Sequence, residues 1–418
     1  MITEDDYKKQ VYYVDGELLD DFVKSDSTAV SGVGYEWENE GVVHLHFTPR
    51  EHGFGTQHIV SFAKENGTHS DSATILVDVA NDGTAKVGDV DVTCIPSREN
   101  LYTRNKGLIE LDILSNKRVL IIGLGSGGSP IAVELAKAGV GQFVLVDFDR
   151  VELHNLSRHI CSIEDLGRLK TDAVCDAIKG KNPYAEVIKL PIDMNKNLDI
   201  MEEEFRKADI ILCCTDNNKS RFNTSDLLFK YKKVGIFGRA ITRAEGGDVF
   251  IYRPGGPCYF CLLGNDWFDP TQEEVTNEQS ARRSGQIAAY ASQDDVEAIV
   301  QVGLGADIEP ISNMMVKLAL MELSRGANSG ISSLEQEFTM NYYIWANRRE
   351  RHYSNWGCFT NSDGMPTIMR WYGMNITAND DCTLCGNREK LAVGENFMES
   401  LRAMGSDNLE GLALPEEN

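Results

Sequence analysis

The sequence predicts an α/β protein with a doubly wound, mostly parallel sheet, preceded by a small β-rich N-terminal domain and followed by a cysteine-bearing C-terminal extension. Three observations lead to this fold class. In the middle of the chain, short apolar runs alternate with helical segments. A glycine-rich turn joins the first of these runs to the helix that follows it. Residues 1–98 contain only short β-branched or aromatic-rich runs, separated by Gly, Asn, Asp and Ser.

The expected elements follow one another in a regular order. In the N-terminal domain, the predicted strands cover residues 11–14, 42–47 and 74–79. In the α/β part, apolar runs predict strands and the periodic segments between them predict helices: strand 118–122, helix 131–138, strand 143–146, helix 170–179, strands 187–190, 210–214, 234–237 and 248–252, and helix 310–323. Strands return between residues 342 and 385. We therefore expect a second domain over residues 99–410, with a polar crossover segment at 263–300 and an acidic tail at 411–418.

Composition and charge exclude several classes of function. The chain has 418 residues, enough for two or three domains, and its 41 Lys and Arg against 64 Asp and Glu give a net charge of -23. Such a surface repels phosphate backbones and anionic lipid. The N-terminus lacks a secretory signal, and no apolar stretch reaches the ~20 residues that a membrane span needs. We expect a cytoplasmic protein that binds neither nucleic acid nor membrane.

The glycine-rich turn predicts a nucleotide site on a Rossmann-like sheet. Four glycines lie between a predicted strand and a helix, where they permit a tight turn and a close approach of phosphate: Gly123, Gly125, Gly127 and Gly128. Asp147 ends the next predicted strand, where a carboxylate can accept hydrogen bonds from ribose hydroxyls. A glycine turn without a ligand is the alternative. It is disfavoured because strand, turn, helix and acid occur together.

Polar residues after the following strands favour ATP over NAD. Five of them lie at predicted strand or helix ends beyond Asp147: Asp149, Asn155, Arg158, Lys170 and Asp216. Hydride transfer has no use for several cations and a second acid around phosphates. Attack on phosphorus does, because cations offset the charge on the phosphoryl oxygens and a carboxylate holds Mg²⁺. An NAD-dependent oxidoreductase remains the rival enzyme, which NADH binding would distinguish from pyrophosphate exchange.

Four cysteines predict a metal site in the C-terminal extension. They form two C-x-x-C pairs with the spacing that a tetrahedral Zn²⁺ prefers: Cys258, Cys261, Cys382 and Cys385. A pair of redox dithiols is the alternative, but a redox C-x-x-C needs a thioredoxin-like context that is missing here. We predict a zinc-bearing extension with knuckles at 258–261 and 382–385.

The run from Val119 to Asp216 resembles the ThiF/MoeB superfamily and its relatives, the ubiquitin-activating enzymes. The resemblance rests on the glycine motif, on D-x-D-x-V-x-x-x-N-L-x-R at residues 147–158, and on the later Lys170 and Asp216. It implies an ATP-dependent adenylyltransferase. In this family the C-terminal glycine carboxylate of a ubiquitin-like or sulfur-carrier protein attacks the α-phosphate of ATP, and the resulting acyl adenylate passes to a thiol.

The resemblance also implies roles for single residues. Asp147 would hold the ribose and Asp216 the Mg²⁺. Three residues would contact the ATP phosphates: Asn155, Arg158 and Lys170. Arg104 lies in a short segment before the first strand, which in the family reaches across a homodimer to the partner's ATP. A homodimer is therefore expected, and a structural zinc is frequent in the family.

The fate of the acyl adenylate is less well defined by the sequence. Thioester-forming members of the family carry a nucleophilic cysteine in the crossover segment, but no cysteine occurs from Leu262 to Gly357. Cys358 is then the first candidate nucleophile. The alternatives are that Cys358 is a buried packing residue, or that the acyl group passes directly to a thiol on a conjugating enzyme.

Two further interpretations complete the analysis. The chain length, the N-terminal extension and the Arg370-Trp-Tyr segment resemble the activating enzymes of bacterial ubiquitin-like conjugation operons, which are often linked to antiviral defence. A non-catalytic, partner-binding scaffold is the remaining alternative from another class. We would expect such a scaffold to lack Arg158, Lys170 or Asp216, and all three are present.

Overall fold

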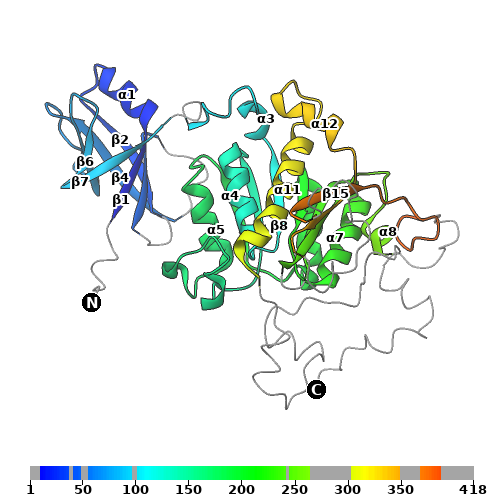
Figure 1. The fold of residues 1–418 in the computed structure, drawn as a ribbon. Coiled ribbons are helices and arrows are strands. Elements are labelled where there is room, and N and C mark those ends of the chain that lie inside the picture. Colours follow the sequence, from blue (N-terminus) through cyan, green and yellow to red (C-terminus); the bar gives the residue numbers. More distant parts are fainter. Residues whose placement is uncertain are drawn as a thin grey trace, which may run out of the picture. The chain divides into compact units, whose positions relative to one another are not determined.

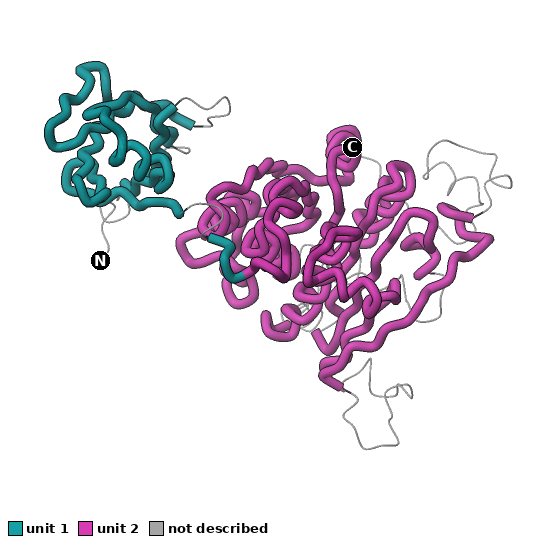
Figure 2. Tube along the Cα trace, turned by 90° about the horizontal axis from the view of Figure 1, so that it is seen from above, with its two compact units in different colours: residues 1–104 teal, residues 105–418 magenta. Residues whose placement is uncertain are grey.

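The chain divides into two units, residues 1–104 and 105–418 (Figure 2). The computed structural model describes residues 10–36, 41–48, 55–96, 101–241, 244–263, 303–348 and 368–386. The predicted crossover segment, apart from Leu263, lies outside these ranges, and so do Cys358 and the predicted acidic tail. Among the helices that fall within them, none is long and apolar enough to cross a membrane.

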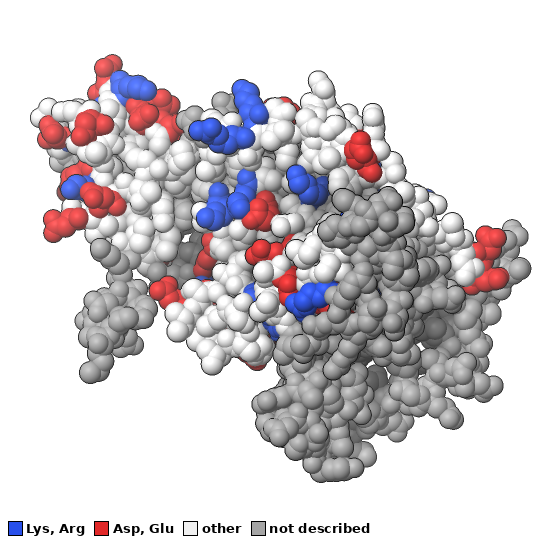
Figure 3. Space-filling view, viewed as in Figure 1, with Lys and Arg blue, Asp and Glu red and all other residues white. Residues whose placement is uncertain are grey.

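In its described residues, the N-terminal unit is a closed barrel of seven strands with the helix α1. The strands follow the order β1-β3-β2-β4-β5-β6-β7 around the barrel, and β7 pairs back with β1. Their bounds are β1 Val11–Asp15, β2 Ala29–Glu36, β3 Val42–His46, β4 Thr56–Lys64, β5 Ile75–Val79, β6 Ala85–Val87 and β7 Val90–Ile95, and helix α1 is Gly16–Lys24. Acidic side chains dominate the face of this unit that Figure 3 shows, in keeping with the negative net charge of the chain.

The predicted strands of the N-terminal domain correspond to β1, β3 and β5, whereas β2, β4, β6 and β7 were missed. Strand β2 contains Gly32 and Gly34, which lower the strand signal. A Cβ atom at Gly32 would lie 2.0 Å from the carbonyl oxygen of His46, so only glycine permits this close approach of β2 to the neighbouring strand. The glycines that the barrel requires in β2 are therefore the residues that weaken its strand signal in the sequence.

The C-terminal unit contains an eight-stranded sheet of order β10-β9-β8-β11-β12-β13-β14-β15 (Figure 1). The first five strands in this order are parallel and the last three are antiparallel. Their bounds are β8 Arg118–Ile122, β9 Gln142–Val146, β10 Glu186–Leu190, β11 Ile210–Cys213, β12 Val234–Ala240, β13 Gly246–Tyr252, β14 Tyr342–Ala346 and β15 Arg370–Met374. The predicted α/β fold class with a mostly parallel sheet is confirmed.

Helices cover both faces of this sheet, as a doubly wound fold requires. One face packs against α4 (Gly128–Ala138), α5 (Lys170–Lys179) and α11 (Gly305–Leu323), which lie over the sheet in Figure 1. The other packs against α6 (Leu198–Lys207), α7 (Asn218–Tyr231) and α8 (Tyr259–Leu263). Strand β8 shows the alternation, because Val119 and Ile121 join the first core while Leu120 and Ile122 join the second. The shorter helical segments are α3 Leu111–Leu114, η2 Leu153–Asn155, η3 Ile163–Asp165, η4 Met194–Lys196, η6 Gly330–Ser333 and α12 Leu334–Glu337.

Helix α11 begins at Gly305, before the predicted start at Pro310. Proline favours the first position of a helix because it lacks an N–H. Here the earlier turn is stabilised instead by Asp307, an acidic residue near the positive end of the helix, which forms an ion pair with Arg348 beyond β14. A contact between distant parts of the chain thus contributes to the stability of the helix start.

The order of the strands reverses between β8 and β11. From β8 the chain adds β9 and β10 on one side, and then returns to add β11 and β12 on the other. In open α/β sheets such a switch point leaves a crevice at the carboxyl ends of the strands, where ligands bind. The glycine turn follows β8 directly, and it lies at this point.

Candidate functional site

A cavity of about 390 Å³ opens at the carboxyl ends of the parallel strands. Its walls come from the segments after β8, β9, β10, β11 and β12 and from α11. Among the predicted site residues that line it are Gly123, Gly125, Gly127, Asp147, Asp149, Asn155, Arg158, Lys170 and Asp216. Residues from separate parts of the chain thus face one space.

The glycine turn has the geometry that its composition predicts. Gly123 has a φ of +88°, in the left-handed region, and a Cβ atom there would lie 2.9 Å from the carbonyl oxygen of Cys214. Gly128 does not line the cavity. A Cβ atom at Gly128 would lie 1.9 Å from the carbonyl oxygen of Gly123, so this glycine lets α4 start directly against the turn. The N-terminus of α4 is therefore close to the cavity, and a helix N-terminus stabilises anions.

Asp147 organises the backbone around the turn. Its Oδ2 accepts a hydrogen bond from the N–H of Leu124 at 2.7 Å, and its Oδ1 accepts one from the N–H of Asp149 at 2.8 Å. Burial raises the pKa of this carboxyl group, an effect that the nearby Lys170 ammonium partly offsets. Asp147, the residue predicted to bind the ribose, therefore also links the turn after β8 to the segment after β9.

Lys170 begins α5 and places its ammonium group at the edge of the cavity. Its Nζ lies 2.9 Å from Asp149 Oδ2, and its side chain is only 10% exposed. Burial alone would lower the pKa of Lys170, but the carboxylates of Asp147 and Asp149 raise it. The lysine is therefore charged throughout the neutral range. Arg158 is half-buried, and Asp216 is exposed in the loop between β11 and α7.

The cavity has lining residues that the sequence analysis did not single out: His159, Asn195, Arg221, Arg239 and Ser312. A signal for Asn195 was available, because it follows β10 and the carboxyl ends of parallel strands share one edge. For Arg239 no local signal exists. Its partner is Asp248, the residue opposite it in the β12–β13 register.

Arg239 and Asp248 form a buried ion pair beside the cavity. The Arg239 Nε and Nη2 atoms lie 3.0 Å and 2.6 Å from Asp248 Oδ2, and the two side chains are 12% and 11% exposed. Although burial lowers the pKa of Arg239, the carboxylate of Asp248 raises it more. The pair therefore adds no net charge to this end of the cavity.

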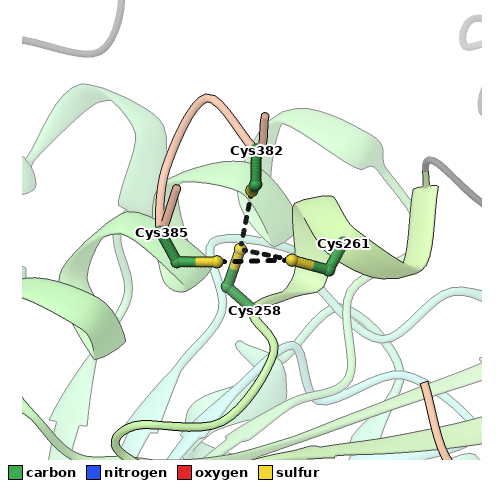
Figure 4. Close-up of side chains that lie close together, drawn as sticks. All are labelled: Cys258, Cys261, Cys382 and Cys385. Carbon is green, nitrogen blue, oxygen red and sulfur yellow. Dashed lines mark hydrogen bonds between the residues drawn. The ribbon is translucent and has the colours of Figure 1, made fainter. Parts of the chain in front are cut away.

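The two C-x-x-C pairs meet in space as one cluster, as Figure 4 shows. The sulfur atom of Cys258 lies 3.9 Å from that of Cys261 and 3.4 Å from that of Cys382. The sulfur atoms of Cys261 and Cys385 are 3.3 Å apart. Four thiolates at about 2.3 Å from a tetrahedral Zn²⁺ would be roughly 3.8 Å apart. The cluster therefore has the donor set and the size to hold a metal ion, and four thiolates suit zinc.

The predicted roles of the site residues stay predictions, including those of Arg104 and Cys358. Arg104 is exposed, and its role at a neighbouring subunit stays a prediction. Cys358 lies outside the residues that the structure describes, so the thioester prediction also stands as it was.

Comparisons with known proteins place the α/β unit among relatives. The model of the ThiF family matches residues 99–349. The protein "Adenylyltransferase and sulfurtransferase MOCS3" of Caenorhabditis briggsae is 33% identical over 167 residues, which cover 39% of this chain and 40% of that relative. "Adenylyltransferase and sulfurtransferase UBA4" of Kluyveromyces lactis is 31% identical over 208 residues, 49% of this chain and 44% of the relative. The chain thus matches less than half the length of these curated relatives.

One solved structure shows a likeness in fold. The crystal structure of E. coli MccB aligns with a TM-score of 0.50 and 18% sequence identity, over 70% of this chain and 74% of that one. At this level of identity the likeness concerns the arrangement of helices and strands alone.

Proposed function

Because the chain belongs to the ThiF family, we propose that it is an adenylyltransferase that activates the C-terminal glycine carboxylate of a ubiquitin-like or sulfur-carrier protein. The carboxylate attacks the α-phosphate of ATP, an acyl adenylate forms, and pyrophosphate leaves. One observation carries the proposal. At the switch point of the sheet, a glycine turn, the cations Arg158 and Lys170, and the carboxylate of Asp216 face the same cavity.

The order of the strands gives the nucleotide a direction in this cavity. Asp147 follows β9, the glycine turn follows β8, and Asp216 follows β11. A ribose at Asp147 therefore sets the phosphates over the glycine turn and toward Asp216. The backbone N–H groups of the turn and of the start of α4 then face the phosphates, which suits the α-phosphate where the bond forms.

The charged side chains act on the phosphoryl oxygens. Lys170 and Arg158 would stabilise the negative charge that develops on these oxygens as the carboxylate attacks, and groups already held in place lose little energy in reorganisation. Lys170 meets this condition because Asp149 fixes its ammonium group. Asp216, exposed to the cavity, is the residue that would hold Mg²⁺, which neutralises the leaving pyrophosphate.

The acyl substrate would enter from the side of β12 and α11. Beyond Asp216 the lining consists mostly of small or apolar residues, among them Gly238, Ala240, Ala244 and Gly303. A Cβ atom at Gly238 would lie 2.2 Å from the sulfur of Met315, so the wall here is tightly packed. A wall of small and apolar side chains leaves room for the extended, glycine-terminated end of a protein.

Several finer features belong to the same proposal. Zinc bound by the four cysteines would join the segment after β13 to the segment after β15. A homodimer would bring Arg104 to the neighbouring ATP. The activated carboxyl would then pass to Cys358 or to a thiol on a conjugating enzyme. The cytoplasmic location and a role in a bacterial antiviral operon remain predictions.

Two measurements test the proposed function. First, calorimetric titration with MgATP and with NADH should show binding of MgATP alone; binding of NADH alone would favour the rival oxidoreductase. Second, the purified chain should catalyse ATP–pyrophosphate exchange when supplied with a small protein that ends in glycine and is encoded beside it. The same protein without its terminal glycine is the matched control. Exchange that does not depend on this glycine would contradict the proposed substrate class.

A further inference from the structure

Two side chains hold the glycine turn at Leu124, one through its N–H and the other through its carbonyl oxygen. The N–H of Leu124 donates to Asp147 Oδ2 at 2.7 Å, and its carbonyl oxygen lies 2.6 Å from His159 Nε2. A peptide unit is planar, so a hydrogen bond to the Leu124 carbonyl oxygen also fixes the direction of the Gly125 N–H in the same unit. Gly125 lines the cavity. His159 is thus linked to a backbone donor of the predicted phosphate site.

The second ring nitrogen of His159 determines where its proton lies. The backbone N–H of Cys161 lies 3.1 Å from Nδ1. A backbone N–H can only donate, so Nδ1 accepts, and the proton of the neutral ring is on Nε2. Nε2 then donates to the Leu124 carbonyl. Only the neutral Nε2–H tautomer makes both bonds, because an imidazolium would turn a second N–H toward that of Cys161.

His159 joins the glycine turn to the segment that carries Asn155 and Arg158. Its own backbone N–H donates to the carbonyl oxygen of Asn155 at 2.9 Å. This segment packs on α5 through a small separate core of Val151, Cys161 and Ala173. The hydrogen bond from His159 to Leu124 also attaches this segment to the glycine turn. The position of Arg158 is therefore coupled to that of the turn.

Burial favours the neutral form of the ring. Burial lowers the pKa of His159, and so does the Lys170 ammonium at the start of α5. The hydrogen bond to Leu124 and the Asp165 carboxylate of η3 act in the opposite direction without overcoming burial. Asp165 is itself paired with Arg168 at 2.7 Å. At neutral pH the ring therefore has the form that the two hydrogen bonds require.

We propose that His159 is a positioning residue of the adenylation site, which as the neutral Nε2–H tautomer clamps Leu124 and holds the glycine turn in its phosphate-binding shape beside Arg158. The inference rests on the proposed binding of ATP. Protonation of the ring places a second N–H against the N–H of Cys161, and this repulsion displaces the ring from Leu124. The affinity for ATP therefore falls as His159 becomes charged.

Two substitutions separate the two hydrogen bonds of the ring. The amide nitrogen of glutamine reaches the place of Nε2, and the amide oxygen of asparagine reaches the place of Nδ1. His159→Gln therefore keeps the donor to Leu124, whereas His159→Asn keeps only the acceptor for Cys161. In titrations of the full chain with MgATP at pH 7.5, we expect the Gln variant to bind within about twofold of wild type and the Asn variant about 5- to 10-fold more weakly.

The pH series adds a readout that packing alone would not change. The nucleotide also titrates, so the relevant quantity is the ratio of the dissociation constants of wild type and the Gln variant. The His159 resonance in ¹⁵N imidazole spectra is the one that the Gln variant lacks. The ratio should rise over the pH range in which this resonance shows that His159 becomes protonated. His58→Gln, in the N-terminal barrel, is the control and should change neither quantity. His58 is also a partly buried histidine with a polar partner, Glu36 at 3.0 Å.

Each outcome decides the proposal. Equal affinities of the Gln and Asn variants with matched melting temperatures, or a constant ratio while the ring becomes protonated, would overturn the clamp. A spectrum showing the Nδ1–H tautomer or a charged ring at pH 7.5 would overturn it without reference to ATP. Failure of the wild-type chain itself to bind ATP, with the Nε2–H tautomer present, would instead reject the proposed function and with it the positioning role.

Discussion

Removal of one partner from the buried ion pair of Arg239 and Asp248 should destabilise the α/β unit strongly. In Asp248→Asn the shape of the side chain is kept, but the buried Arg239 guanidinium loses the carboxylate that lies 2.6 Å from its Nη2. Two charges about 4 Å apart interact by about 4 kcal/mol at an effective dielectric constant near 20. Breaking a buried pair by removal of one partner costs about 3 to 5 kcal/mol, which agrees with this figure. The loss is a large part of the about 5 to 15 kcal/mol that stabilises a domain.

The assay is equilibrium unfolding in urea, monitored by tryptophan fluorescence. Trp345 is opposite Gly247 in the β13–β14 register, next to Asp248, and it lies 5.5 Å from Trp371 between ring centroids, so it reports on this unit. The double variant Arg239→Met with Asp248→Leu should recover most of the loss, because apolar residues of similar size replace a buried pair at little cost.

The matched control is an exposed ion pair on α6. Glu203 lies 2.6 Å from Lys207, with side chains 63% and 48% exposed, and Glu203→Gln should leave the unfolding curve unchanged. A loss below about 1 kcal/mol in Asp248→Asn would refute the reasoning, since it would place the pair in a solvent-like environment. A double variant less stable than Asp248→Asn would also contradict it.

Further predictions concern the proposed chemistry. Asp216→Ala should lower pyrophosphate exchange by about 100- to 1000-fold without a change in melting temperature, because the side chain is an exposed electrostatic group; near-normal exchange would reject the assignment. Elemental analysis should find one zinc per chain, and the double substitution Cys382→Ser, Cys385→Ser should remove it and lower the melting temperature; protein purified without chelator that holds no zinc would oppose the claim. Inactive Arg104→Ala mixed with inactive Asp216→Ala should regain some activity if Arg104 serves the partner subunit, whereas no recovery despite subunit exchange would count against it. If the acyl group passes to Cys358, non-reducing gels should show a thioester that Cys358→Ala abolishes. A band that survives this substitution eliminates Cys358, and no band in either protein supports direct transfer to a thiol on a partner.

The parts of the fold that the sequence predicted well are those with a strong local signal. The strand β8, the glycine turn and the start of α4 are contiguous, and the apolar run, the glycines and the helical periodicity all indicate the same structure. Helix α5 was predicted over its whole length, Lys170–Lys179, for the same reason. Membership in the ThiF family was also readable, because its motifs lie within short segments between Val119 and Asp216.

Helices α6 and α7 were missed. In α6 a signal was available, because Leu198, Met201 and Phe205 have helical spacing, whereas the pattern of α7 is weak in isolation. Helix α7 buries polar residues such as Asn218, Ser220 and Arg221, so its buried face is not apolar in the sequence. Its hydrogen-bonding partners come from elsewhere in the fold. The Oγ of Ser220, for example, accepts a hydrogen bond from the Nδ2 of Asn195, which follows β10, at 3.0 Å.

The sequence by itself determined the class of sheet, the glycine turn and the sets of cysteines and charged residues, because each depends on residue type at short spacing. Tertiary structure alone decided which distant groups meet. The convergence of Cys258 and Cys382, the pairing of Arg239 with Asp248, and the contact of His159 with Leu124 each join separate elements. Such contacts depend on strand order, register and backbone direction, and these follow from the packing of the whole unit, for which no short stretch of sequence contains the information.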